Sequence, residues 1–580
     1  MRRALPASVL SLLFVVVGCG VEADDGTATD DADYTEGSGE AKAVFALLND
    51  ANVTAEELVS GAKVTSPVGR DLVAHRNGPD GRAGTQDDDP FDSLREVDEV
   101  PGVGPATIKK LFEYAKSKGY YDAGGASGAT RVIFSPAPAE TSHLNEIAKE
   151  IDKAEKSVDV AIYSFSDAKI TDALGRAVAR GVKVRLVFND APADARLPAA
   201  GQANSKSAKL EAAGINVRYI NKIMHHKFAI IDGPRADLAS AKTARLISGS
   251  ANWSSSAATR YDENTMFFNG NEELNLRFQR EFDNMWAHSR DFVAKDLPYE
   301  LSTTSITDAV LQSADKPSQN VFFTSANFTP RDTTFSGTGT NAVADPLVAA
   351  IQSATRSIKI ASGHLRSRPV AEALIAKKTA TPSIDIKVYL DGQEYIAKGT
   401  HDIQVDQLEE CIAAATTPAK KRACTDKGFL FGYQVGQAGI EVRYKYYAYR
   451  WDHGYAPQMH HKFMVIDGSR LYSGSYNLSD NAEHETFENM MMLDGAENAA
   501  LVKAFDDNFE KIWKTGKDDN KLASLNAKID AGGNFPIVFD AMALSWAEVT
   551  ALKTKIRSSC PAVDSQEYRS EPASHQFCSR

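Results

Sequence analysis

Short apolar runs alternate with amphipathic stretches along most of the chain. Residues 158–163, 182–188 and 228–231 are rich in Val, Ile and Phe with few polar breaks, as expected of buried strands. Between the first two runs, residues 172–180 place apolar side chains at helical spacing. Strands that alternate with helices predict an α/β fold, in which helices flank a central β-sheet.

The second half of this pattern repeats the first. The segment AGINVRY at 213–219 returns as AGIEVRY at 438–444, and MHHKF occurs both at 224–228 and at 459–463. The repeat is too long for a solenoid and predicts two similar α/β domains. Two such domains in one chain can pack about a pseudo-two-fold axis, as the subunits of an isologous dimer do, so that equivalent residues face each other.

The chain begins with a processing signal. Arg2 and Arg3 precede an apolar run, residues 9–17, that is too short to span a bilayer. The run ends in Gly18-Cys19, which resembles the lipobox of bacterial lipoproteins and predicts lipidation of the Cys19 thiol after cleavage. We therefore expect a protein anchored in the cell envelope, at the outer membrane or cell surface, whereas an ordinary signal peptide would release a secreted protein.

Changes in composition divide the rest of the chain. The stretch after Cys19 is acidic and rich in small polar residues, which is typical of a flexible tether. The predicted segments are a signal peptide (1–18), a tether (19–40), a small all-α domain (41–123), two α/β domains (130–295 and 318–520) and a carboxy-terminal tail with a cysteine pair (521–580).

Four cysteines remain if Cys19 is lipidated, which is an even number in an oxidising compartment. The pairing that is local in sequence joins Cys411 to Cys424 and Cys560 to Cys578, and two other pairings stay possible. No C-x-x-C spacing occurs, which argues against a zinc or redox site. The cysteines therefore predict disulfide bonds.

The charge of the chain bears on its partners. The composition is ordinary for a soluble globular protein, with 43% hydrophobic and 24% charged residues, and the net charge is −12. A negative molecule does not attract nucleic acid as a whole, although a local basic groove would still bind phosphates. The acidity therefore weighs against nucleic acid as a partner without excluding it.

Both halves place the same polar residues around the repeated MHHKF strand. Each has an H-x-K-x4-D pattern, then Gly-Ser-x-Asn, then Glu-Asn. Residues two apart on a strand share a face, so the first histidine and the lysine point the same way. The second histidines, His226 and His461, point to the other face, where we expect structural roles. The candidate site residues are His225 and His460, Lys227 and Lys462, Asp232 and Asp467, Ser250 and Ser475, Asn252 and Asn477, and Glu263 and Glu488.

With two such motifs, the chain resembles the phospholipase D superfamily over roughly residues 130–520. The resemblance implies two phospholipase D-like domains that share one active site. There, one histidine attacks phosphorus to give a phosphohistidine, and the other protonates the leaving oxygen. It assigns the nucleophile to His225 and the general acid to His460, although the near-equivalent halves leave the reverse order open.

The same resemblance suggests roles for the other motif residues. The lysines, serines and Asn residues are expected to bind the charged non-bridging oxygens, which is the main contribution to phosphoryl transfer. The aspartates are expected to act structurally, and the glutamates to fix the histidine tautomers. Because the lysines supply positive charge, we expect no metal ion or other cofactor. One chain carries both motifs, which predicts a monomer.

The predicted all-α domain contains residues 97–106, which resemble a helix-hairpin-helix motif. The two glycines at 102 and 104 allow a tight turn before the helix that starts near residue 106. In DNA-binding relatives the free N–H groups of that helix hold a backbone phosphate, and Lys109 and Lys110 would assist. The acidic run at 87–89 favours a structural or protein-binding role instead.

Three functional classes therefore compete. The first and preferred class is a phospholipase D that hydrolyses phospholipid head groups at the membrane that anchors it. The second is a secreted DNA endonuclease of the same superfamily, which the helix-hairpin-helix region favours. The third is a non-enzymatic protein, tethered to the envelope, that binds DNA or acts in adhesion.

Overall fold

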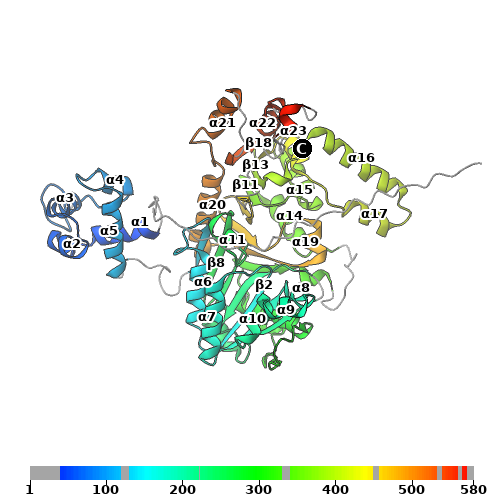
Figure 1. The fold of residues 1–580 in the computed structure, drawn as a ribbon, viewed down its shortest axis with the longest axis horizontal. Coiled ribbons are helices and arrows are strands. Elements are labelled where there is room, and N and C mark those ends of the chain that lie inside the picture. The colour runs from blue at the N-terminus through cyan, green and yellow to red at the C-terminus, as the bar shows by residue number, and fades with distance from the viewer. Residues whose placement is uncertain are drawn as a thin grey trace, which may run out of the picture. The chain divides into compact units, whose positions relative to one another are not determined.

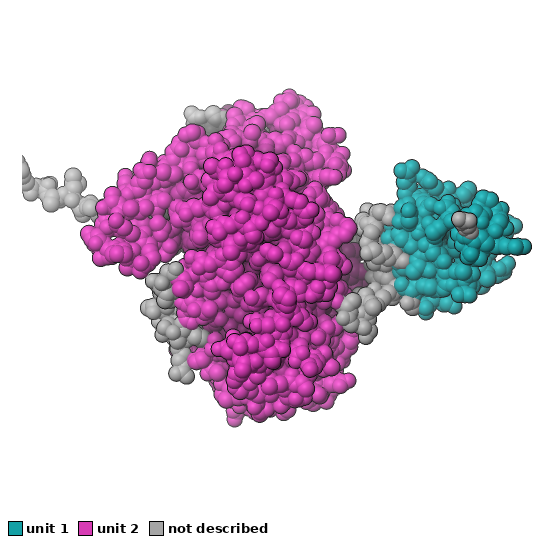
Figure 2. Space-filling view, turned by 180° about the vertical axis from the view of Figure 1, so that it is seen from behind, with its two compact units in different colours: residues 1–122 teal, residues 123–580 magenta. Residues whose placement is uncertain are grey.

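The structure, a computed structural model, describes residues 39–85, 87–118, 120, 130–220, 223–328, 340–448, 456–531, 539–559 and 565–570. Two compact units make up the chain, residues 1–122 and 123–580 (Figure 2). The predicted signal peptide, the lipidated Cys19 and all but the last two residues of the predicted tether lie outside the described residues, and so do Cys560 and Cys578. Those two residues, 39 and 40, begin a helix. Among the helices that are described, none combines the length and hydrophobicity needed to cross a bilayer.

The described part of the first unit is helical. Its core holds Leu47, Leu72, Val97 and Leu111, each at most 1% exposed. A five-residue turn between its last two helices contains Gly102, whose φ of +85° favours a residue without a Cβ. Its helices are α1 (Gly39–Asn49), α2 (Ala55–Gly61), α3 (Ser66–Arg76), α4 (Leu94–Glu99) and α5 (Pro105–Ser117).

The first half of the second unit is built on an eight-stranded sheet in the order β1-β8-β7-β6-β2-β3-β4-β9. Strands β2, β3 and β4 run parallel to one another, and the remaining pairs are antiparallel. The strands are β1 (Arg131–Ser135), β2 (Ser157–Ile162), β3 (Lys183–Phe188), β4 (Asn216–Tyr219), β6 (Lys227–Ile231), β7 (Arg245–Gly249), β8 (Glu263–Asn269) and β9 (Arg290–Asp291).

The second half repeats this sheet strand for strand, in the order β10-β17-β15-β14-β11-β12-β13-β18. Strands β11, β12 and β13 form its parallel part. Two α/β halves with the same topology confirm the fold predicted from the sequence repeat. The strands are β10 (Gln319–Phe323), β11 (Ser357–Ser362), β12 (Asp385–Asp391), β13 (Glu441–Ala448), β14 (Lys462–Ile466), β15 (Arg470–Gly474), β17 (Asn489–Leu493) and β18 (Phe539–Ser545).

Part of the carboxy-terminal tail completes the second sheet. Strand β18 pairs antiparallel with β13 at the sheet edge. After it, helix α22 (Trp546–Ser558) begins with a capping box between Ser545 and Glu548 and packs against both strands. Residues 539–558 are therefore an integral element of the second half.

Helices cover both faces of each sheet. Helices α6 (His143–Asp152) and α7 (Ala168–Ala179) lie side by side over the outer face of the first sheet (Figure 1). On the inner faces, α12 (Glu272–Ala287) and α20 (Ala499–Ile512) belong to a hydrophobic core that both halves share. That core combines Phe228, Phe278 and Phe282 with Phe463, Phe505 and Phe509. Each buried phenylalanine contributes about 1.5–3 kcal/mol, so this core fixes the two halves against each other.

The remaining elements connect the strands. In the first half they are β5 (Ile223–Met224), α8 (Ala191–Ala195), α9 (Ala199–Ala203), α10 (Lys206–Ala212), η1 (Leu238–Lys242), α11 (Ser255–Thr259) and α13 (Asp308–Ala314). In the second half they are η2 (Thr324–Asn327), α14 (Ala344–Ser353), α15 (Arg368–Ala380), η3 (Gly392–Glu394), α16 (Lys398–Ala414), α17 (Pro418–Thr425), α18 (Gly432–Gln437), α19 (Asp480–Glu485), β16 (Thr486–Phe487), η5 (Ala496–Asn498), α21 (Lys521–Asp530) and α23 (Gln566–Ser570).

A disulfide bond joins Cys411 to Cys424, between α16 and α17. This confirms one of the two predicted local pairs. The bond closes a short loop, and loop closure of this length stabilises a fold by about 3 kcal/mol in the chain-entropy description.

Candidate active site

The two H-x-K segments enter equivalent strands from the same edge of each sheet. His225 and His460 each lie two residues before their strands, β6 and β14, and the lysine is the first residue of each strand. The Nζ atoms of Lys227 and Lys462 each donate to the carbonyl of the histidine two residues earlier, at 2.8 Å. Both lysines are at most 2% exposed, so their charges are held in a poorly solvated site.

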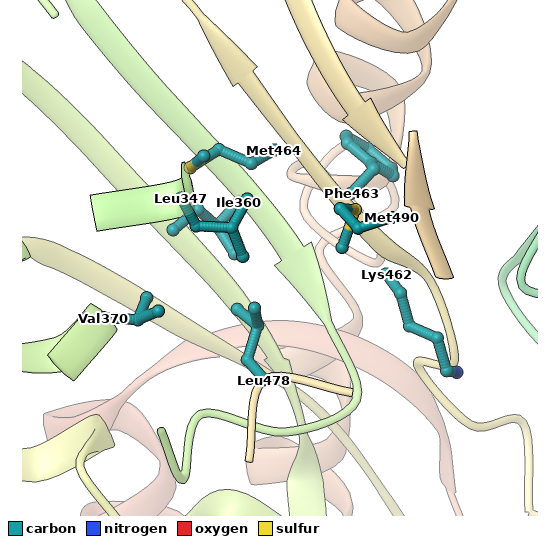
Figure 3. A pocket seen from close by; sticks show the side chains of 8 residues that line it. All are labelled: Leu347, Ile360, Val370, Lys462, Phe463, Met464, Leu478 and Met490. Carbon is teal, nitrogen blue, oxygen red and sulfur yellow. The ribbon is translucent and has the colours of Figure 1, made fainter. Parts of the chain in front are cut away.

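The Lys462 side chain lies at the boundary between core and site. Its aliphatic stem lines a small cavity together with apolar residues such as Ile360, Leu478 and Met490, and its amino end points away from them (Figure 3). The cavity has a volume of about 10 Å³, which is the space of a single water molecule. It is too small for substrate and serves only to hold the stem of the lysine.

Backbone pairing across the two halves positions the histidines. Strand β5, just before His225, pairs in parallel with β16 of the second half, and Met459, just before His460, forms a parallel bridge with Asp262. The N–H groups of the histidines donate to backbone carbonyls of the opposite half, at 3.0 Å for His225 and 3.1 Å for His460. Each catalytic candidate is therefore held by the half to which it does not belong.

The same crossing places a glutamate under each histidine. The Nδ1 of His225 lies 2.7 Å from Glu488 Oε1, and the Nδ1 of His460 lies 2.5 Å from Glu263 Oε1. Both glutamates are at most 1% exposed. The His460 contact is a hydrogen bond, whereas the His225 contact is a close approach without hydrogen-bond geometry. Because Nδ1 faces the glutamate in both rings, the ring atom of each histidine that is left to react is Nε2. This arrangement matches the supporting role predicted for the two glutamates.

The serines of the two Gly-Ser-x-Asn segments lie behind this site. Both are fully buried, and each Oγ accepts the backbone N–H of the Asn that follows the glutamate, at 3.0 Å. A Cβ on Gly249 or Gly474 would come within 2.3 Å of that Asn backbone, so the glycines permit the close approach. We therefore revise the predicted substrate-binding role of Ser250 and Ser475 to that of supports for the glutamate segments.

The second histidines of the two motifs are structural, as expected. His226 and His461 are fully buried. The side-chain nitrogens of Asn489 and Asn264 lie 2.9 and 3.2 Å from their Nδ1 atoms, again across the two halves. On the far side of its ring, His226 Nε2 lies 3.3 Å from Glu281. These contacts link the interface of the two halves to the strands that carry the site.

The asparagines of the Gly-Ser-x-Asn segments lie on the loops that follow β7 and β15, at the same sheet edges as the histidines. Asn252 is 5% exposed. Within the described part of the chain, the Oδ1 atoms of Asn252 and Asn477 have no hydrogen-bond partner. Without such a partner, either end of the side-chain amide can face the site, and its N–H₂ end can donate to a substrate oxygen. Phosphate contact by these side chains stays a prediction.

The two motif aspartates lie at the opposite ends of their strands. Asp232 and Asp467 both adopt left-handed backbone conformations, with φ of 54° and 55°. Each carboxylate accepts three consecutive backbone N–H groups, from residues 155–157 and 355–357, at 2.6–3.1 Å. They tie the turn after the catalytic strand to the start of the neighbouring strand, as predicted for a structural role.

Replacing Asp467 with alanine should destabilise the fold by about 2 kcal/mol. Partial burial alone would raise the pKa of this carboxyl group, but the N–H groups of Ser357, Arg356 and Thr355 lower it from 3.8 to about 2. The contribution is therefore complete above pH about 4 and is lost as the pH falls through about 2. The free energy of unfolding, measured in urea at several pH values, gives this contribution. Asp467→Asn is the matched control, because Asn tolerates the same φ and lacks only the charge, and an equal stability of both variants would refute the electrostatic account.

Burial dominates the electrostatics of the site. Burial, followed by the charges of Lys227 and Lys462, lowers the pKa of both His225 and His460 well below 6.5. Burial also raises the pKa of Glu263 to about 7 and that of Glu488 to about 8, against the opposing charges of the lysines. Each His–Glu pair therefore titrates as one unit near neutral pH. A protonated pair carries hydrogen on Nε2 and can act as an acid, whereas a deprotonated pair presents a lone pair there.

We expect kcat/KM for a phosphodiester to follow a bell-shaped pH profile. Its maximum should lie between pH about 7 and about 8, which are the pKa values of the two glutamates. In more acidic solution both pairs are protonated and no nucleophile is left. In more alkaline solution neither pair can protonate the leaving oxygen. A diester with a p-nitrophenolate leaving group needs no acid, so its profile should lose the alkaline limb. An alkaline limb that persists with this substrate would contradict the assignment of that limb to the acid.

Several residues of the site escaped prediction from the sequence. The ring of Tyr163 meets that of His225 edge-on, with centroids 4.5 Å apart, and the ring of Tyr261 lies 6.0 Å from that of His460. Lys445 and Asp262 form a buried ion pair of 2.8 Å beside the second strand crossing. Tyr163 is the last residue of a predicted strand, and comparison with its counterpart Gly363 in the repeat was the signal that could have identified it.

The chain is similar to known proteins over both α/β halves. The family model described as "Cardiolipin synthase, PLD-like domain" matches residues 147–286 and 347–513, which is more than half of the chain. The mitochondrial cardiolipin hydrolase of Drosophila melanogaster is 32% identical over 25% of this chain and 58% of that protein. A phospholipase D of Rickettsia conorii is 35% identical over 22% of this chain and 56% of that protein. The chain thus spans a little over half the length of these curated relatives.

Solved structures are similar at low identity. The phospholipase D family member Nuc from Salmonella typhimurium has a TM-score of 0.22 and 18% identity, covering 34% of this chain and 95% of that one. Phosphatidylserine synthase from Haemophilus influenzae has a TM-score of 0.42 and 11% identity, covering 65% of this chain and 85% of that one.

Proposed function

Because this chain belongs to the phospholipase D-like domain family, we propose that it is a phosphodiesterase that hydrolyses phospholipids through a phosphohistidine intermediate. The observation that carries the proposal is the pair of His–Glu units, each assembled from both halves, beside two buried lysines. One unit has to act as nucleophile and the other as acid, and two units with different pKa values meet that need. The higher pKa of Glu488, about 8 against about 7 for Glu263, favours the proton on the His225 pair, so the assignment of His225 as nucleophile rests on the family resemblance and not on these pKa values.

The reaction proceeds in two displacements. The Nε2 lone pair of His225 attacks phosphorus, the bond from phosphorus to the leaving oxygen breaks, and His460 transfers its proton to that oxygen. A water molecule then gives its proton to His460 and attacks phosphorus, which breaks the N–P bond and releases a phosphate monoester. Lys227 and Lys462 neutralise the non-bridging oxygens in both steps, in the role that a metal ion has in other phosphodiesterases.

Two observations support a phospholipid as substrate. The relatives named above are a cardiolipin hydrolase and a phospholipase D. The lipobox-like sequence at Cys19 would also keep the enzyme on a membrane, where its substrate is concentrated. We place the mature protein in the cell envelope on the same ground.

A DNA endonuclease is the second candidate. The turn between α4 and α5, with Gly102 at positive φ and Lys109 exposed, has the form of a backbone-phosphate contact. DNA bound there would make the helical unit a substrate-delivery element, whereas a phospholipase would use it as a scaffold or spacer.

The test uses the chain from Asp24 onward together with its His225→Ala variant, both in excess chelator. Each is incubated with vesicles of phosphatidylcholine or cardiolipin and, separately, with single- and double-stranded DNA. Lipid hydrolysis that is lost in the variant supports the proposal. Cleavage of DNA alone, also lost in the variant, would replace it with the nuclease. If neither substrate is turned over, the choice of a phosphodiester substrate is wrong.

A further inference from the structure

The loop after β11 differs from its counterpart in the first half at the position nearest to the histidine. Gly363 and Tyr163 are equivalent, because their N–H groups donate to the carbonyls of His461 and His226 at 3.1 and 2.9 Å. Tyr163 covers one side of the His225 ring, whereas Gly363 has no side chain. A Cβ added to Gly363 would lie 3.9 Å from the Cα of His460, so the two backbones are in direct contact.

Two of the residues that follow Gly363 are basic and partly exposed. The side chains of His364 and Arg366 are 32% and 34% exposed, and the equivalent positions in the first half are serines, Ser164 and Ser166. Arg and His in place of two serines give this loop of the second half nitrogen donors that the first half lacks. His364 directly follows Gly363, whose N–H donates to the carbonyl of His461, so its backbone lies beside the segment that carries His460.

A buried carboxylate orients both basic side chains. Glu394 is fully buried, and its Oε1 accepts from Nε and Nη2 of Arg366 at 2.9 and 2.6 Å and lies 3.0 Å from Nδ1 of His364. Its Oε2 accepts the backbone N–H of Leu365 at 3.2 Å. No acceptor among the described residues engages Nη1 of Arg366 or Nε2 of His364. One carboxylate thus holds two donors and leaves their outer nitrogens for another anion.

We propose that Arg366 and His364, held by Glu394, form a second anion subsite beside His460 that binds a phosphate carried by the leaving alcohol of the substrate. The inference rests on the proposed phospholipid hydrolysis and narrows its substrate to a phospholipid whose head group itself bears a phosphate. His460 protonates the leaving oxygen, so a subsite next to His460 meets the leaving group. The diacylglycerol part of the substrate remains with phosphorus on His225.

The test compares substrates that differ in the leaving group. The leaving group of cardiolipin is an alcohol that carries its own phosphodiester. The leaving group of phosphatidylcholine is choline, and that of bis(p-nitrophenyl) phosphate is a phenolate. In Arg366→Met and in His364→Gln, we expect kcat/KM for cardiolipin to fall about 10- to 100-fold, the value of a charge-assisted hydrogen bond to phosphate. Turnover of the other two substrates should change less than about threefold, because the reacting groups are untouched.

Two controls keep the outcome decisive. Arg470→Met removes an arginine of similar exposure, 36%, that pairs with Asp494 at the other end of the sheet, and it should leave all three rates unchanged. If Arg366→Met fails to fold because Glu394 loses its partner, the three substrates are compared with Arg366→Lys and His364→Gln instead. An equal loss on all three substrates in a folded variant would overturn the subsite. Failure of the unmodified enzyme to hydrolyse any of them would overturn the proposed function instead.

Discussion

Replacing His225 with alanine should lower phosphodiester turnover about 10⁴-fold or more, on lipid and on activated substrates alike. The reason is that the intermediate forms on the motif histidine that attacks phosphorus. Of the two motif histidines, His460 is the other one, and it is needed as the acid. Turnover of bis(p-nitrophenyl) phosphate in excess chelator measures the loss, and protein quenched in denaturant at alkaline pH should no longer contain an acid-labile phosphoryl group.

The His225→Ala variant should keep its fold. Burial raises the pKa of Glu488 to about 8, so the carboxyl group left without its partner stays largely neutral at pH 7. A thermal unfolding midpoint within a few degrees of the unmodified protein is the control. Turnover above about one per cent in a folded variant would exceed what the loss of a nucleophile allows and would remove His225 from that role.

The repeat made the main features of the fold predictable. Two copies of MHHKF with matching flanks required two α/β halves, and strand periodicity correctly separated His225 and Lys227 on one face from His226 on the other. The aspartates were correctly placed outside the site. These features depend only on residues that are close in sequence, where spacing fixes geometry.

Contacts between distant segments could not be predicted in the same way. That Glu488 meets His225, and Glu263 meets His460, follows from the crossing of the two halves through β5, β16 and the 262–459 bridge. Spacing gave no indication of that crossing. Ser250 was misassigned because its side chain turns into the core, where it accepts the Asn264 N–H. The tail strand β18 was missed because residues 521–580 have no counterpart motif in the first half.

The asymmetry of the site lies outside the motifs. Motif residues are the same in both halves, so they cannot decide which histidine attacks phosphorus. Two differences lie in the residues around the histidines: Tyr163 against Gly363, and the ion pair of Lys445 with Asp262, which is 2.8 Å long and has no equivalent among the corresponding residues Ile220 and Phe487. The first gives His225 an aromatic neighbour that His460 lacks at the equivalent position, and the second lies beside the backbone that holds His460, so the two histidines meet different parts of a substrate.

Replacing His460 with alanine should separate the acid from the nucleophile. Turnover of phosphatidylcholine or cardiolipin should fall about 10²- to 10⁴-fold, because an alkoxide leaves poorly without a proton. With bis(p-nitrophenyl) phosphate, formation of the phosphohistidine needs no acid, so the first release of p-nitrophenolate should stay within about tenfold of the normal rate. Hydrolysis of the phosphohistidine still needs a base, so the phosphorylated enzyme should accumulate. The p-nitrophenolate should then appear as a burst of one equivalent per site.

The burst decides the order that sequence and symmetry leave open. If His225 is the nucleophile, His460→Ala gives the burst and His225→Ala gives none. If the roles are reversed, the two variants exchange behaviour, and mass analysis of the trapped protein locates the phosphoryl group on His460. Absence of a burst in both variants would refute a covalent histidine intermediate, since a direct attack by water leaves no phosphorylated enzyme in either case.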